Sequence, residues 1–258
     1  MSKYFEAFNR SAQSNPHVGR RATEELHEMP EDVAPLITAV PAVHAVAARL
    51  SRARSIQRIT ERVAPAATVR KPVRMLISGC RPGDGASSVA VALAVDLSQR
   101  LGMRTLLVDA HLRHPTLRQL IGQEGAPDPR IIADSPTGNF IVRTGLARME
   151  LATCVAKSPE RMAQVASELD AIISDYPVAI VDLGVLRLDP ATLGLAREDD
   201  PIVLVVRYGH TERSDLVTTV RALNGAGRPV AGVVLNSKRN PVPQIVRQFL
   251  GTGETSEA

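Results

Sequence analysis

Short apolar runs rich in β-branched residues alternate along this chain with longer amphipathic stretches. The runs predict strands at about 74–79, 105–109, 139–143, 178–182, 202–207 and 230–235. The stretches between them predict helices at about 87–101, 115–121, 158–175, 189–197 and 212–226, with a last one at 243–250. Runs such as 202–206 are apolar at every position, as in strands that are covered on both faces. The alternation therefore predicts an α/β fold with a mainly parallel sheet and helices on both faces.

The region before the first predicted strand has a different pattern. Residues 1–14 hold aromatic side chains at helical spacing, so we expect a short helix that docks on this domain or on a partner. Residues 15–40 are polar and acidic and contain three prolines, which predicts an irregular strap over the surface. A helix is expected at 41–58, and residues 60–72 would connect it to the first strand.

These patterns divide the chain into three parts. We expect an N-terminal helix and irregular strap over 1–40, one folded domain over 41–250, and a flexible tail over 251–258. No stretch approaches the length of a membrane-spanning helix, and no charged start precedes an apolar run. A cytoplasmic location is therefore predicted, with any recruitment to the inner membrane made through a partner.

Composition and charge narrow the functional classes a little further. Hydrophobic residues make up 44% of the chain and aromatic residues only 3%, so the core must be aliphatic. The formal net charge is +4 and no long basic run is present, so nucleic acid is not expected as a partner. Cys80 and Cys154 belong to no CxxC or Cys/His cluster, which argues against a disulfide framework and a zinc site.

A glycine-rich turn follows the first predicted strand and leads into a helix. Its residues are Arg81, Pro82, Gly83, Asp84, Gly85, Ala86, Ser87 and Ser88. A strand, a glycine-rich turn and a helix form the layout of a phosphate-binding loop, so these eight are the candidate nucleotide-binding residues. A functional loop of this kind ends Gly-Lys-Ser/Thr. Here Ala86 follows Gly85, so the loop lacks the lysine that contacts the terminal phosphates.

Two later predicted strands end in an aspartate, at Asp109 and at Asp182. Ligands of a parallel sheet bind beyond the carboxyl ends of its strands, so these carboxylates and Ser87 are candidate Mg²⁺ ligands. A single aspartate at such a place more often caps the next element. Two of them after a phosphate loop favour a nucleotide site.

Together these motifs resemble the cytoplasmic kinase domain of the bacterial tyrosine kinases (BY-kinases) of capsule and exopolysaccharide synthesis, within the ParA/MinD-like P-loop ATPases. Residues 82–88 are similar to the family's Pro-Gly-Glu-Gly-Lys-Ser-Thr loop, 106–113 to its Asp-x-Asp-x-Arg motif and 179–185 to its Asp-x-Pro-Pro motif. Weaker similarities lie at 1–8, 157–162 and 232–236. The resemblance covers about residues 35–238. It implies a three-layer P-loop fold, ATP or ADP with Mg²⁺ as cofactors, and kinase activity.

The chain departs from the family pattern at the positions that carry the chemistry. Ala86 replaces the lysine, His111 replaces the second acidic residue of the second motif, and no proline follows Asp182. The catalytic set is therefore not intact, and its remnants are Asp109, His111, Arg113 and Asp182. Phosphoryl transfer depends on positioning and charge neutralisation, and losing one such contact costs about 10²–10³ in rate. These changes weaken the case for bound ATP or ADP and for Mg²⁺.

Two departures lie outside the site. Val46, Arg49 and Arg52 stand where the family has its oligomerisation motif Glu-x-x-Arg-x-x-Arg, so ring assembly through that motif is in doubt, and a homo-oligomer stays an open alternative. The family's C-terminal tyrosine cluster, its autophosphorylation target, is absent from residues 249–258.

Three functional hypotheses follow. The first is a pseudokinase that serves as a regulatory or scaffold subunit in exopolysaccharide or capsule synthesis and export. Its partner would be the cytosolic part of a membrane chain-length or export protein, or an active kinase. The second is an active ATP-dependent switch or tyrosine autokinase in which Arg81, at the place of the signature lysine of ParA/MinD-like ATPases, contacts phosphate. The third is a ParA/MinD-like positioning protein that would use Lys238, Arg239 and Arg247.

A Ser/His/Asp hydrolase is disfavoured, because no Gly-x-Ser-x-Gly turn frames a serine.

Overall fold

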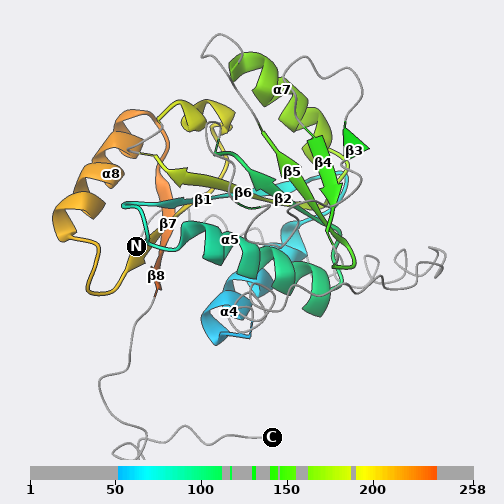
Figure 1. Ribbon diagram of the computed structural model, residues 1–258, viewed down its shortest axis with the longest axis horizontal. Helices are drawn as coiled ribbons and strands as arrows, with labels where there is room; N and C mark the ends of the chain where they lie inside the picture. Colours follow the sequence, from blue (N-terminus) through cyan, green and yellow to red (C-terminus); the bar gives the residue numbers. More distant parts are fainter. Residues whose placement is uncertain are drawn as a thin grey trace, which may run out of the picture.

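The computed structural model of the chain (Figure 1) describes residues 52–111, 117, 130–131, 140–144, 146–154, 162–186 and 190–236. Several predicted features lie outside these residues. They are the aromatic helix at 1–14, the strap at 15–40, most of the helices at 41–58 and 115–121, the helix at 243–250, the tail at 251–258, and the residues Val46, Arg49, Arg113, Lys238, Arg239 and Arg247.

One eight-stranded sheet forms the centre of the fold, in the order β3-β4-β5-β2-β6-β1-β7-β8. The strands are β1 (Val73–Gly79), β2 (Thr105–Asp109), β3 (Arg130–Ile131), β4 (Phe140–Arg143), β5 (Met149–Thr153), β6 (Val178–Val185), β7 (Ile202–Arg207) and β8 (Val230–Asn236). The strands from β5 to β8 in this order pair in parallel, and β3 and β4 add an antiparallel edge. The predicted mainly parallel sheet is confirmed.

The prediction was incomplete at the β4–β5 edge. The strand expected near 139–143 is present as β4, but it runs antiparallel to β5. The strand β5 was not predicted at all, because Met-Glu-Leu-Ala-Thr contains a single β-branched residue. It pairs with β2 on one side and β4 on the other, so its neighbours rather than its own propensity make it a strand.

Helices cover both faces of this sheet (Figure 1). One face carries α4 (Arg54–Val63), α5 (Ala86–Val95) and η3 (Asp96–Arg100), and the other carries α7 (Met162–Ile173), η5 (Pro190–Leu195) and α8 (Arg213–Gly225). Side chains alternate between the two cores along each strand, so that Leu107 joins the α5 side while Leu106 and Val108 join the α7 side. The predicted three-layer α/β arrangement is confirmed.

Two helix boundaries differ from the prediction. The helix α4 continues to Val63 and leads into η2 (Ala64–Ala66), although residues from 60 onward were expected to be a connection. The helix expected at 189–197 is only the short 3₁₀ segment η5. Among the described residues, no helix is both long and apolar enough to cross a bilayer.

A buried arginine on β1 joins the sheet to the α7 layer. Arg74 pairs with Asp170 of α7, and its Nε lies 3.0 Å from Oδ2 of Asp200, which precedes β7. The side chains of Arg74 and Asp200 are only 4% and 7% exposed. Burial raises the pKa of Asp200 because it penalises the charged form, and the nearby Arg74 charge opposes this rise. Arg74 therefore offsets the cost of a carboxylate held away from water.

Replacement of this arginine tests that role. We expect Arg74→Ala to lower the free energy of unfolding by about 3 kcal/mol, because Asp200 would keep its burial and lose its counter-charge. Denaturant unfolding measures the change. Arg221→Ala, at an exposed position of α8, is the control and should change stability by less than about 0.5 kcal/mol. Equal effects of the two substitutions would contradict the interpretation.

Candidate functional site

The predicted phosphate loop joins the end of β1 to the start of α5. Gly85 is the N-cap of α5 and has φ 89°, and Gly83 has φ 85°. Both values lie in the left-handed region, which glycine adopts without steric cost. Ala86, the first residue of α5, is buried in the core. The lysine position is therefore filled by a methyl group that packs inside the protein.

The carboxylate of Asp84 folds back into the loop and is almost completely buried. Its Oδ2 accepts the N–H groups of Cys80 (3.0 Å) and Arg81 (2.8 Å), and its Oδ1 accepts the hydroxyl of Thr211 (2.6 Å). These bonds stabilise the start of the loop from within the protein. They also tie it to the segment between β7 and α8, which carries Thr211.

The last residue of β7 and the same segment hold the tip of the loop from outside. Nη1 of Arg207 donates a hydrogen bond to the carbonyl oxygen of Gly83 at 3.4 Å. Nε2 of His210 lies 3.0 Å from the carbonyl oxygen of Pro82, which requires a proton on that nitrogen. The loop and the β7–α8 segment therefore form one hydrogen-bonded unit.

Asn236, the last residue of β8, completes this unit. Its Nδ2 donates to the carbonyl oxygen of Asp84 at 2.8 Å. A Cβ atom placed on Gly85 would lie 2.2 Å from the same nitrogen. Gly85 is therefore required for its left-handed backbone and also for the close approach of Asn236.

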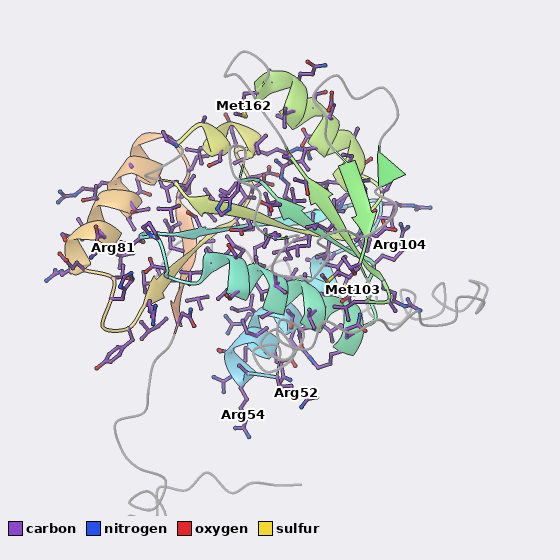
Figure 2. The ribbon with its side chains drawn as sticks, viewed as in Figure 1. Arg52, Arg54, Arg81, Met103, Arg104 and Met162 are labelled. Atoms are coloured by element: carbon purple, nitrogen blue, oxygen red, sulfur yellow. The ribbon has the colours of Figure 1, made fainter. Side chains whose placement is uncertain are left out.

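Arg81 is paired with acidic residues at the start of α8. Its Nη1 lies 3.1 Å from Oε1 of Glu212 and 3.3 Å from Oδ2 of Asp215, and it donates to the carbonyl oxygen of His210 at 3.3 Å. Figure 2 labels Arg81 beside α8. A contact between this guanidinium and a phosphate would compete with both ion pairs.

The two predicted strand-end aspartates lie side by side. Asp109 of β2 and Asp182 of β6 are register partners on adjacent parallel strands, and both are fully buried. Oδ1 of Asp109 accepts the N–H of His111 at 3.1 Å, and its Oδ2 accepts the N–H of Leu117 at 2.7 Å. Backbone N–H groups therefore bind both oxygens of Asp109. This is the arrangement expected if the aspartate caps the element that follows its strand.

Asp182 keeps one oxygen available. Its Oδ1 accepts the N–H of Gly184 at 3.0 Å, whereas Oδ2 has no hydrogen-bond partner among the described residues. The Ser87 hydroxyl lies close enough to this carboxylate to affect its pKa. Burial raises the pKa of Asp182, and His111 and Ser87 oppose that rise. Burial also raises the pKa of Asp109, and the N–H groups of Leu117 and His111 oppose it. The structure therefore brings Ser87, Asp109 and Asp182 together.

These three residues fit Mg²⁺ only in part. Hydroxyl and carboxylate oxygens are suitable ligands for this ion, but Asp109 already accepts two backbone bonds. No group of three or more His, Cys, Asp or Glu side chains suited to a metal is found in the described part of the chain. Asp182 and Ser87 would hold the ion only with phosphate oxygens as further ligands.

His111 and Gly184 form a matched pair above this site. A Cβ atom on Gly184 would lie 1.5 Å from Nε2 of His111, and Gly184 has φ 64°. The imidazole therefore occupies the space where any other residue would place its side chain. Gly184 stands at the position of the first proline in the Asp-x-Pro-Pro motif. The absence of that proline and the presence of His111 are thus structurally coupled.

Sequence reasoning missed much of the loop's support. Thr211 and His210 carry no motif, and their contacts depend on where the chain turns between β7 and α8. Cys80 was expected in the loop, and it stands where the phosphate-loop pattern counted back from Gly85 has its first glycine. Cys80 is buried in the core on the α7 side.

No family model matches this chain. Individual bacterial proteins do match it. The chain is 26% identical over 173 residues to EpsB of Ralstonia solanacearum, a protein named among the tyrosine-protein kinases. That match covers 63% of this chain and 22% of EpsB, so the chain spans about a fifth of that relative. It is 25% identical over 181 residues to the tyrosine-protein kinase YwqD of Bacillus subtilis, covering 64% of this chain and 72% of YwqD.

The chain is a relative of the bacterial tyrosine kinases. The kinase domain of the Escherichia coli tyrosine kinase ETK superposes with a TM-score of 0.60 at 19% identity, covering 85% of this chain and 86% of that domain. The cell division ATPase MinD of Pyrococcus furiosus superposes with a TM-score of 0.52 at 19% identity, covering 69% and 78%. At 19% identity, these two structural matches show that the fold is shared and nothing more. The predicted resemblance to BY-kinases with MinD-like relatives is confirmed.

Substitution of the N-cap glycine tests the support of the loop in this BY-kinase relative. We expect Gly85→Ala to lower the free energy of unfolding by at least about 1–2 kcal/mol, because alanine is strained at this φ and contacts Asn236. Adding Asn236→Ala should recover only the part due to the clash, as thermal unfolding of the single and double variants would show. Gly225→Ala is the control, since open space surrounds Gly225. A Gly85→Ala variant as stable as this control would be inconsistent with the described loop.

The buried carboxylate of Asp182 gives a pH-dependent prediction. Because its pKa is raised in the folded state, the wild-type protein loses stability as pH rises from the ordinary carboxyl pKa through the raised value. We expect Asp182→Asn to be more stable than wild type at pH 7, with a gain that shrinks as the pH falls from the raised pKa to the ordinary carboxyl pKa of about 4. Denaturant unfolding across pH measures this gain. Asp199→Asn, at an exposed position, is the control, and a variant less stable than wild type at pH 7 would refute the prediction.

Proposed function

We propose that this BY-kinase relative is a pseudokinase that has lost phosphoryl transfer and acts as a regulatory or scaffold subunit. The observation that carries the proposal is that neither position of the loop where a cation could contact phosphate offers a free positive charge. Ala86 replaces the lysine, and the guanidinium of Arg81 is engaged by Glu212 and Asp215. Transfer of a phosphoryl group needs fixed positive charge at the phosphates.

The second motif supports the same proposal. In the family pattern an acidic residue stands where this chain has His111. A neutral imidazole is a poor ligand for Mg²⁺, and its ring here packs against Gly184 instead of leaving room for a ligand. Asp182 would remain as an acceptor for a proton or a metal-bound water. On its own it supplies neither the charge nor the positioning that transfer requires.

Nucleotide affinity is proposed to be weak. MinD of Pyrococcus horikoshii complexed with Mg-ADP superposes with a TM-score of 0.50 at 20% identity, so the fold is one that accommodates a nucleotide. In this chain the loop is stabilised by Asp84, Thr211 and Asn236. The N-terminus of α5 would still attract a phosphate. Without the lysine, that attraction is reduced.

The proposed role is in exopolysaccharide or capsule synthesis and export, at the cytoplasmic face of the inner membrane. The partner would be the cytosolic part of a chain-length or export protein, or an active tyrosine kinase. The support is the similarity to EpsB and YwqD, both tyrosine-protein kinases by name. We retain one folded domain over 41–250 as part of this proposal.

Calorimetry and a turnover assay with Mg²⁺ test the proposal. We expect no ATP hydrolysis above background and weak or undetectable binding of ATP and ADP. The variant Ala86→Lys should bind nucleotide at least about tenfold more tightly, because a charge-assisted hydrogen bond contributes about 1.5–3 kcal/mol. Ser88→Lys, one residue beyond the metal-proximal Ser87, is the control for an added charge in the same loop.

Hydrolysis by the wild-type protein that disappears in Asp182→Ala would overturn the pseudokinase proposal. In that case Arg81→Ala distinguishes the alternatives, since loss of turnover in this variant would establish the switch in which Arg81 substitutes for the lysine.

A further inference from the structure

The solvent side of α4 carries a row of arginines. Arg54, Arg58 and Arg62 are exposed and four residues apart, so they lie along one side of the helix. The opposite side packs into the core through Ile56 and Val63. Figure 2 shows the side chain of Arg54 pointing away from the body of the protein. We call the surface formed by Arg54, Arg58 and Arg62 the basic face.

Positive charge is concentrated around this face. Residues 52–71 contain six Arg and Lys residues and one acidic residue, a net charge of +5, whereas the whole chain has +4. The acidic residue, Glu61, pairs with Arg100 of η3 at 3.1 Å. The rest of the chain is thus close to neutral overall, and a single short region accounts for the excess.

An acidic run in the sequence is complementary to this region in charge. Residues 24–32 contain Glu24, Glu25, Glu28, Glu31 and Asp32, a net charge of −5. The two regions therefore carry opposite charges of the same size, −5 for residues 24–32 and +5 for residues 52–71.

The connection between the two regions is long enough for them to meet. Residues 33–51 separate the acidic run from the described start of the chain, and a chain of that length reaches roughly 60 Å when extended. The helix α4, with 10 residues, is only about 15 Å long. Tethering gives the acidic run a high effective concentration at the helix, which individually weak surface ion pairs need.

We propose that the acidic run at 24–32 binds the basic face of α4 in the same chain. The contact is electrostatic and therefore sensitive to salt. It covers the basic face, so an anionic partner has to compete with the chain's own N-terminal region for this surface.

Zero-length cross-linking tests the contact in the full-length chain. The variant Arg54→Lys/Arg58→Lys/Arg62→Lys keeps the charge and supplies amines that carbodiimide joins to carboxylates. We expect cross-linked peptides that connect α4 to residues 24–32, and their loss in 1 M salt, where the Debye length is about 3 Å. Arg221→Lys on α8 is the matched control and should give no such product. If the α4 variant also gives no cross-linked product, the proposal is overturned.

Isotope labelling separates one chain from two. In a mixture of heavy and light protein, contact within one chain gives only heavy–heavy and light–light pairs. Mixed pairs in statistical proportion would mean that the acidic run binds a second copy, which also overturns the proposal.

Heparin, used as an anionic probe, tests whether the acidic run covers the basic face. We expect Glu24→Gln/Glu28→Gln/Asp32→Asn to elute from a heparin column at higher salt than a variant with the same charge change elsewhere. The matched control is Asp175→Asn/Glu198→Gln/Asp199→Asn, at three exposed positions. Elution of both variants at the same salt concentration would refute the proposal.

Discussion

The parallel pairing of β2 and β6 is the constraint on which the site depends. Parallel strands in register end at the same edge, so Asp109 and Asp182 are held next to each other in a place without water. Two buried carboxylates repel each other and are poorly solvated, and the protein has to provide partners for them. It does so with the N–H groups of Leu117 and Gly184, with the Ser87 hydroxyl nearby and with the imidazole of His111.

The loop after β1 is stabilised in a similar way. Asp84 accepts hydrogen bonds from the backbone of its own loop and from Thr211, and Asn236 donates to its carbonyl oxygen. Elements far apart in sequence therefore hold the loop in place through groups of the protein itself. A loop supported in this way needs less contribution from a nucleotide to stay folded, which suits a role based on shape and contact.

Much of the architecture could be predicted from the sequence, because strands buried on both faces read as continuous apolar runs. Most of the parallel strands were found in this way, and the helices α5, α7 and α8 were found as the stretches between these runs. The strand β5 could not be found, since its pairing with β2 and β4 is a tertiary effect. The strand-end aspartates were predicted from position alone. The neighbours of the loop were not, because they come from turns whose path the sequence does not encode locally.

The interlocking of His111 with Gly184 has an evolutionary consequence. Changing the histidine back to an acidic residue would leave a hole over the glycine, and restoring the proline alone would collide with the ring. Each step is unfavourable without the other, so their effects are not additive. A lineage that has passed through both changes meets a barrier on the way back. Packing alone would then keep His111 and Gly184 together, independently of whether selection favours the chemistry of the family motif.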